Sequence, residues 1–204
     1  MFKTYVLAAC ALTAIAALAH ATDVALATAS GQAGYSAWRP FNVNDLDAAS
    51  FGVEWIDNAD SASAGFGSAL FFTFTIAAGA TGTLTVVDAG FAGDTFNVTN
   101  FGSVFGSTSA VPATVYDSAT LSVANFDAAL ASPSFSRGLY TLAAGTYRIG
   151  GVLDQSVTFD GTTPLNATLG AVRLTVATAV PEPSTWALLL AGAAFVGLLA
   201  RRRL

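Results

Sequence analysis

The feature that most constrains the fold is a regular alternation of apolar and polar side chains. Between Leu70 and Ile76, every second residue is Leu, Phe or Ile, and threonine occupies two of the three positions between them. The same alternation recurs in residues 83–87, 95–99, 147–149 and 172–176. A period of two is that of a β-strand with one buried face. The chain is therefore expected to be all-β.

Turn-forming residues separate these stretches. They are Ala78-Gly79, Ala89-Gly90, Asn100-Phe101-Gly102, Ala144-Gly145 and Asp160-Gly161. Glycine reaches the positive φ that many tight turns require. Many short strands joined in this way are typical of an antiparallel β-sandwich or jelly roll. The residues predicted to face its core are Phe72, Phe74, Ile76, Leu84, Val86, Ile149, Val172 and Leu174.

Two short segments resemble each other. Residues 75–86 and 141–152 both place Ala-Ala-Gly between apolar strand residues. An internal repeat would explain the similarity, but a turn used twice explains it more simply.

One segment, residues 122–131, is expected to be a helix. Ser122 is a suitable N-cap, and apolar residues follow it at helical spacing. Pro133 is expected to end the helix.

The N-terminus has the layout of a secretory signal peptide. Lys3 precedes an uncharged stretch from Tyr5 to Leu18, and the small-x-small sequence Ala19-His20-Ala21 follows. The stretch is short for a membrane anchor. Residues 1–21 are therefore predicted to be removed, which leaves Thr22 as the mature N-terminus.

This removal would restrict the available chemistry. The only cysteine, histidine and lysine of the chain are Cys10, His20 and Lys3, all within the predicted signal. The mature protein would form no disulfide, no Ser-His-Asp or Cys-His catalytic site and no zinc site built on Cys or His. Glu54 is the only glutamate of the body, and no carboxylate pair with the signature of a glycosidase is evident. We expect no enzyme and no catalytic residues.

The predicted ectodomain, residues 22–179, is strongly acidic. It contains four arginines and twelve acidic residues, for a formal charge of −8. Phosphate backbones would repel such a surface, so nucleic acid is excluded as an expected partner.

One polar cluster suggests calcium. Asp88, Asp94, Asn97 and Asn100 supply oxygen atoms around a glycine-containing loop. The same residue types also favour turns, and the spacing is not that of an EF-hand. They are the calcium candidates, and no other cofactor is expected.

Aromatic residues suggest a second kind of site. Trp38 and Trp55 lie in a loop-like region near Tyr35 and Phe41. Most of these side chains are expected to pack in the core or at an edge. The alternative is a face on which sugar rings stack.

The C-terminus combines three features. Pro181-Glu182-Pro183 forms an extended peptide, the uncharged run Trp186 to Ala200 follows it, and Arg201, Arg202 and Arg203 come last. As a helix, the run would measure roughly 22 Å, against about 30 Å of bilayer hydrocarbon. Three arginines favour a cytoplasmic C-terminus. We expect a marginal transmembrane helix within a tail of residues 180–204.

This tail resembles the PEP-CTERM sorting tail of Gram-negative bacteria, over about residues 180–203 only. The resemblance implies that an exosortase, a membrane cysteine protease-transpeptidase, recognises Pro181-Glu182-Pro183 and removes the anchor. It also implies export as an inner-membrane precursor, then a place on the cell surface or in an exopolysaccharide matrix.

The expected function is therefore that of a non-catalytic structural protein of the surface or matrix, with exosortase and exopolysaccharide as partners. The alternative is a carbohydrate- or calcium-binding module.

Overall fold

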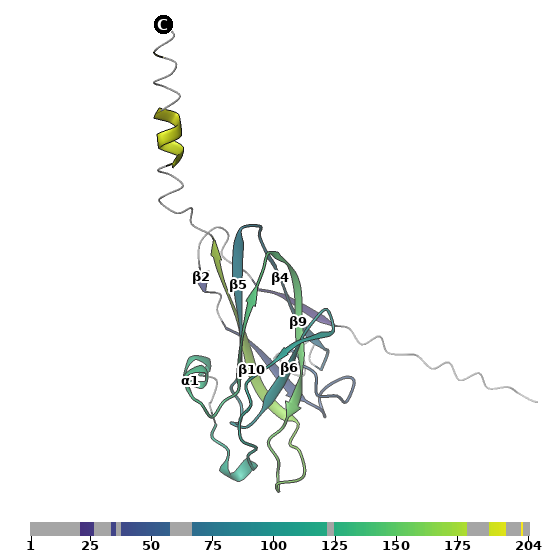
Figure 1. Ribbon diagram of the computed structural model, residues 1–204. Helices are drawn as coiled ribbons and strands as arrows, with labels where there is room; N and C mark the ends of the chain where they lie inside the picture. Colours follow the sequence, from purple (N-terminus) through teal and green to yellow (C-terminus); the bar gives the residue numbers. More distant parts are fainter. Residues whose placement is uncertain are drawn as a thin grey trace, which may run out of the picture.

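The computed structural model describes residues 21–26, 34–35, 38–57, 67–121, 125–178, 188–194 and 201. Two mostly antiparallel sheets face each other in its body (Figure 1). The first sheet has the strand order β1-β4-β9-β6-β7, and the second has the order β2-β10-β5-β8, with β3 also paired to β10. The expectation of an all-β fold with two antiparallel-rich sheets is confirmed. The predicted signal peptide lies outside the described residues except for Ala21.

The elements have the following bounds: β1 Thr22–Ala25, β2 Gly34–Tyr35, β3 Arg39–Asn44, β4 Leu70–Ile76, β5 Ala80–Asp88, β6 Thr95–Asn100, β7 Ser103–Ser107, the 3-10 turn η1 Tyr116–Ser118, α1 Phe126–Ala131, β8 Arg137–Leu142, β9 Gly145–Gln155 and β10 Ala167–Thr178. Each alternating stretch of the sequence lies within one of these strands. The expected turns fall between strands, with Gly79, Gly102 and Gly161 at positive φ. Among the strands of the described residues, only β1 departs from the antiparallel pattern, since it pairs with β4 in parallel.

The two sheets enclose one apolar core. All eight residues predicted to face inward are buried, with exposed fractions from 0% to 7%. They come from both sheets, since Phe72, Phe74, Ile76 and Ile149 lie on β4 and β9, and the others lie on β5 and β10. Because alternate side chains of a strand point to opposite faces, the sequence period alone locates this core.

An aromatic stack occupies the middle of the core. The rings of Phe41 and Trp55 lie 3.9 Å apart at an interplanar angle of 14°, and both are buried. A Cβ added at Gly170 would collide with the Phe41 ring, and one added at Gly151 would collide with Trp55. Glycine is therefore required at both positions by the close approach of backbone and ring.

The outer face of the second sheet carries a smaller core. Val87, which the alternation assigned to the second face of its strand, is fully buried beside Ala129 of α1 and Phe135. The arginine of β10 holds α1 in place: Arg173 pairs with Asp127 at 2.8 Å, and its guanidinium carbon lies 4.2 Å from the centre of the Trp38 ring. The outer face of the second sheet is thus covered by α1 near Val87.

The helix is shorter than the sequence suggests. It spans Phe126–Ala131, and its N-cap is Asn125, whose side chain accepts a hydrogen bond from the Ala128 amide. The expectation of Ser122 as N-cap was wrong, because Asn125 offers an equally good cap closer to the residues that pack on the sheet. The helix ends before Pro133, as expected.

Candidate functional site: a buried acid pair beside an open pocket

The site lies at one end of the sandwich. Strand β5 begins at Ala80, which is the register partner of Thr178 at the end of β10, and it finishes at Asp88. We call the end at Asp88 the distal end, because it lies opposite the C-terminus of β10 (Figure 1). Asp94 directly precedes β6 in the segment that crosses from the second sheet to the first. The crossing brings Asp88 and Asp94 together.

Both carboxyl groups are buried. Asp88 is 0% exposed and Asp94 is 1% exposed. One oxygen of each is satisfied by the backbone: Asp88 Oδ1 accepts from the Gly90 amide at 3.3 Å, and Asp94 Oδ1 accepts from the Val157 amide at 2.7 Å. The Oδ2 atom of each has no protein hydrogen-bond partner among the described residues.

Burial sets the protonation of the pair. Desolvation, reinforced by the charge of Asp94, raises the pKa of Asp88 to about 9. Desolvation also raises the pKa of Asp94 to about 6, against the opposing effect of its hydrogen-bonding groups. At neutral pH, Asp88 is therefore protonated and Asp94 is ionised, so the two buried carboxyls share one negative charge. Buried carboxyl oxygens without a protein partner are the groups that an ordered water or a bound cation completes in other proteins.

The other two calcium candidates have different partners. The Asn97 side chain donates to Asp154 at 2.9 Å and accepts from the Ser107 hydroxyl at 2.6 Å. The Asn100 side chain accepts from the Arg148 amide at 3.1 Å. Within the described part of the chain, no group of three or more His, Cys, Asp or Glu residues is arranged to hold a metal ion. Only Asp88 and Asp94 of the four candidates are thus brought together.

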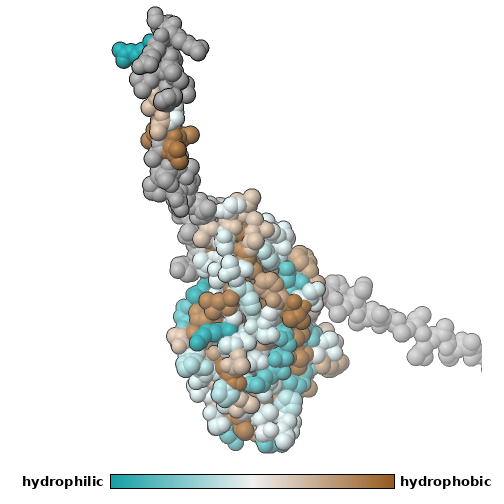
Figure 2. All heavy atoms as spheres, in the orientation of Figure 1, coloured by the Kyte–Doolittle hydropathy of each residue, from teal (hydrophilic) through white to brown (hydrophobic). Residues whose placement is uncertain are grey.

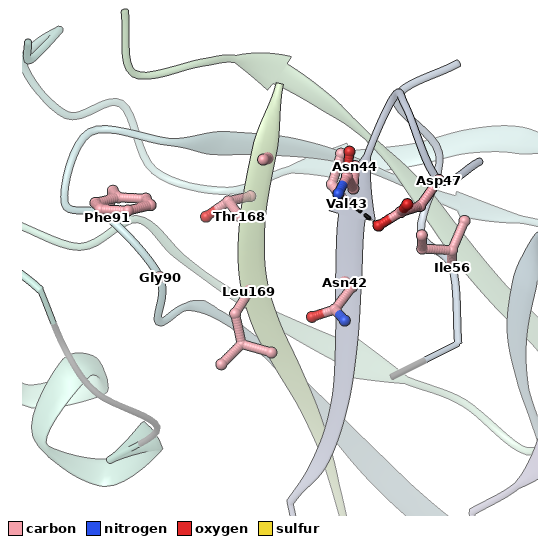
Figure 3. Close-up of a pocket in the computed structure, with 10 residues that line it drawn as sticks. Asn42, Val43, Asn44, Asp47, Ile56, Gly90, Phe91, Thr168 and Leu169 are labelled. Atoms are coloured by element: carbon pink, nitrogen blue, oxygen red, sulfur yellow. Dashed lines mark hydrogen bonds between the residues drawn. The ribbon is translucent and has the colours of Figure 1, made fainter. Parts of the chain in front are cut away.

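An open pocket of about 290 Å³ lies at the same end of the sandwich, and its lining includes Gly90, whose amide donates to Asp88. Figure 3 shows the residues that line it. Its polar residues are Asn42, Asn44, Asp47 and Thr168, and Phe91 forms part of its wall. The Asn44 side chain donates to Asp47 at 2.6 Å, so these two groups are held in place. Amides, a carboxylate, a hydroxyl and an aromatic ring that line one pocket are groups that proteins use to bind polar ligands.

Thr168 links the pocket to the acid pair. It lines the pocket, and its hydroxyl lies close enough to Asp94 to offset part of the rise in that group's pKa, although the geometry is not that of a full hydrogen bond. A Cβ at Gly90 would lie 2.5 Å from Thr168 Oγ1. Glycine at position 90 therefore lets the segment after β5 approach β10 closely enough to bring the pocket and the pair together.

Exposed aromatic residues gather near this pocket. The rings of Phe91 and Tyr116 lie 5.0 Å apart, and those of Tyr116 and Phe159 lie 6.1 Å apart. Tyr116 and Phe159 are 44% and 53% exposed. The sequence analysis missed this group, because its members come from three separate connections and no periodicity relates them.

The aromatic residues that it did single out have structural roles. Phe41 and Trp55 belong to the core, as the sequence favoured, and they are too buried for a sugar to reach. Trp38 packs against Phe126 and donates through its ring nitrogen to Asp127 at 3.1 Å, so it fastens α1 to the sheet. The side chain of Tyr35 lies outside the described residues.

The C-terminal candidates lie mostly outside the described residues. This holds for Pro181, Glu182, Pro183, Arg202 and Arg203, whereas Arg201 is described as exposed. Residues 188–194 are helical, and the three leucines at 188–190 are 64–74% exposed. None of the described helices has both the length and the apolar composition needed to cross a membrane. The transmembrane helix stays a prediction.

Comparison with known families identifies the C-terminal tail. Residues 179–203 match the PEP-CTERM protein-sorting motif. The chain therefore carries a β-rich body followed by the sorting signal of an exosortase substrate. The motif implies export, targeting to the cell surface and an exosortase as processing partner. No curated protein and no solved structure matches this chain.

Proposed function

We propose that this protein is a non-catalytic structural component of the cell surface or extracellular matrix, associated with exopolysaccharide after an exosortase has released it from the membrane. The observation that supports release of an intact body is the position of the sorting motif. It begins at residue 179, directly after β10, whose last paired residue is Thr178. Cleavage within the motif would leave every described strand in place, so the released product would keep its fold.

The precursor would be held in the inner membrane by residues Trp186 to Ala200. Helical residues 188–194 with exposed leucines support such an anchor, because lipid would bury apolar surface that is otherwise in water. Arg201, Arg202 and Arg203 would keep the C-terminus in the cytoplasm.

The test replaces Pro181, Glu182 and Pro183 with alanine in the full chain, in a host with the matching exosortase. The matched control replaces the adjacent Ser184 and Thr185 with alanine. Fractionation should find the first variant as an uncleaved, membrane-held precursor, and the control should be released like the wild type. Equal release of all three would show that the motif is not the recognition element.

A second candidate function is that of a carbohydrate- or calcium-binding module. It is supported by the open pocket at the distal end, whose Thr168 also approaches a buried pair with two unsatisfied carboxyl oxygens. A sugar would use Asn42, Asn44 and Asp47 for hydrogen bonds and Phe91 for contact with a ring face. A calcium ion would use Asp88 and Asp94, and it would have to displace the proton of Asp88.

A glycan array with the purified full chain, with and without EDTA, separates these possibilities. Binding that Asn42→Ala and Phe91→Ala abolish, and that the exposed substitution Asp117→Asn leaves intact, would assign a sugar site to the pocket. Loss of binding in EDTA and in Asp94→Asn would add a calcium requirement. If no glycan binds and Ca²⁺ titrates without heat, the distal end has neither role.

A further inference from the structure

The folded body and the sorting motif are almost contiguous along the chain. Thr178 is still paired with Ala80 in the second sheet, and the motif match begins at the next residue. The last strand is therefore ordered up to the edge of the peptide that the processing enzyme reads.

Covalent geometry limits how far that peptide can stand from the body. Pro181 is three residues beyond Thr178, and a fully extended chain spans at most about 3.6 Å per residue, so Pro181 lies within about 11 Å of Thr178. The apolar run begins only at Trp186, whose greatest possible distance from Thr178 is about 29 Å by the same rule. A protein that encloses Pro181-Glu182-Pro183 must therefore come close to the end of the sandwich. The bilayer, which the chain enters only at Trp186, can lie farther away.

Two turns lie at this end, the first beside Thr178 and the second one strand farther along the second sheet. Residues 77–79 connect β4 to β5, and residues 143–144 connect β8 to β9, so each turn crosses from one sheet to the other. The register pairs Ile76 with Gly145 and Gly82 with Leu142, which places the two turns side by side. We call their exposed residues the tail-proximal face: Ala77, Ala78, Gly79, Ala143 and Ala144.

The face is compatible with close contact. Its side chains are small and uncharged, and the backbone carbonyls of Ala77 and Ala143 are already occupied by the Ala80 amide and the Tyr147 hydroxyl. In Figure 2, the end of the body nearest the tail is drawn mostly in white and pale brown. No charged group of this face has to lose its hydration when another surface covers it.

We propose that the tail-proximal face is a docking surface for the exosortase-type enzyme during processing, so that the enzyme reads the end of the folded body together with the motif. The proposal rests on the processing proposed above. It assigns the two Ala-Ala-Gly turns a role that neither the fold nor the motif match assigns to them.

The test measures the rate of processing of the full chain in a host with the matching exosortase. Ala78→Arg/Ala144→Arg and Ala78→Glu/Ala144→Glu alter the face, and the matched control, Ala113→Arg, alters an exposed alanine of the distal end. Both face variants should be processed about tenfold more slowly, since an interface excludes a buried, unpaired charge of either sign. The control should be processed at the wild-type rate.

A spacer separates docking from misfolding. Eight Gly and Ser residues inserted after Thr178 would let the motif stand away from the body by up to about 29 Å more. Because docking requires the face to lie within reach of the motif, the spacer should slow processing of the wild-type chain about tenfold and should slow the face variants no further. Wild-type rates in both face variants, or an unchanged rate in the wild-type chain with the spacer, would overturn the proposal. Slowing by glutamate alone would also overturn it, because it would indicate repulsion by an anionic bilayer surface.

These outcomes are distinct from a failure of the proposed function. If the wild-type chain is not processed, or if the alanine variant of Pro181-Glu182-Pro183 is processed normally, the sorting role itself fails. If those two results are as expected and the face variants behave like the wild type, only the docking surface fails.

Discussion

The two ends of the sandwich differ in how their strands are connected. At the tail-proximal end, residues 77–79 and 143–144 are short turns that leave little beyond the sheets. At the distal end, residues 108–136 and 156–166 form long connections. They contain α1, the exposed aromatic residues Tyr116 and Phe159, and Val157, whose amide donates to Asp94. Long connections on a rigid scaffold are where binding groups accumulate.

The difference would let one small body serve the two partners proposed above. The sorting tail leaves from the end with short turns, so the processing enzyme would approach there. The pocket, the acid pair and the aromatic group lie at the distal end, opposite the pairing of Ala80 with Thr178. If the proposed functions are correct, a ligand at the distal end would remain accessible while the chain is still held at its tail.

The largest expected effect concerns the acid pair and pH. The pKa of Asp88 is raised to about 9, from 3.8 for an ordinary aspartate. Between these values the folded state keeps a proton that the unfolded state has lost, so the free energy of unfolding falls as pH rises. The fall should be about 1.4 kcal/mol per pH unit, or about 3 kcal/mol from pH 6 to pH 8. Urea unfolding at the two pH values measures it.

Asp88→Asn should remove most of this pH dependence, because an amide does not titrate. The exposed Asp117→Asn should leave it unchanged. The body has no histidine or cysteine to titrate in this window. Equal stability of the wild type at pH 6 and pH 8 would contradict the assignment, and recovery of stability by Ca²⁺ at pH 8 alone would show a cation taking the place of the proton.

The second expected effect compares a glycine in the core with one at the tail-proximal end. Gly170→Ala should destabilise the protein by about 2 kcal/mol, because its methyl group would overlap the Phe41 ring. Gly79→Ala meets no atom within 4 Å and should cost only about 1 kcal/mol for its positive φ. Thermal unfolding of both variants measures the two losses of stability. A larger loss in Gly79→Ala than in Gly170→Ala would mean that the core accommodates an added methyl group more easily than the turn does.

The smallest expected effect concerns the attachment of α1 to the second sheet. Asp127→Ala removes the contacts with Arg173 and with the Trp38 ring nitrogen. Because Asp127 is largely exposed, the loss of stability should be about 0.5–1 kcal/mol. Trp38 fluorescence should shift, since its ring loses a polar partner, whereas Asp117→Ala should change neither quantity. An unchanged Trp38 spectrum in Asp127→Ala would show that α1 does not depend on this contact.

The alternation of apolar and polar residues was enough to predict strands β4, β5, β6, β9 and β10 and the eight core residues named from them, and the order of residues at the C-terminus was enough to predict the sorting tail. Strands β1, β2, β3, β7 and β8 were not predicted, because they carry no clear alternation. The alternation from Leu70 to Ile76 favours a strand, because a strand places Leu70, Phe72, Phe74 and Ile76 on one face, whereas a helix would spread them around its axis. The tail could be recognised from the sequence because a sorting motif is defined by the order of residues along the chain.

Tertiary structure alone decided which polar residues meet. Asp94 and Asn97 are neighbours in sequence, yet Asp94 lies beside Asp88, while Asn97 bonds to Asp154 across the first sheet. The turn after β5 and the register of β6 with β9 set this difference, and neither is encoded in the local pattern. The same reason explains Val87, whose position in a strand was predictable but whose burial depends on a helix that begins at Phe126. Local periodicity fixes which way a side chain points, and only the packing of distant segments fixes what it meets there.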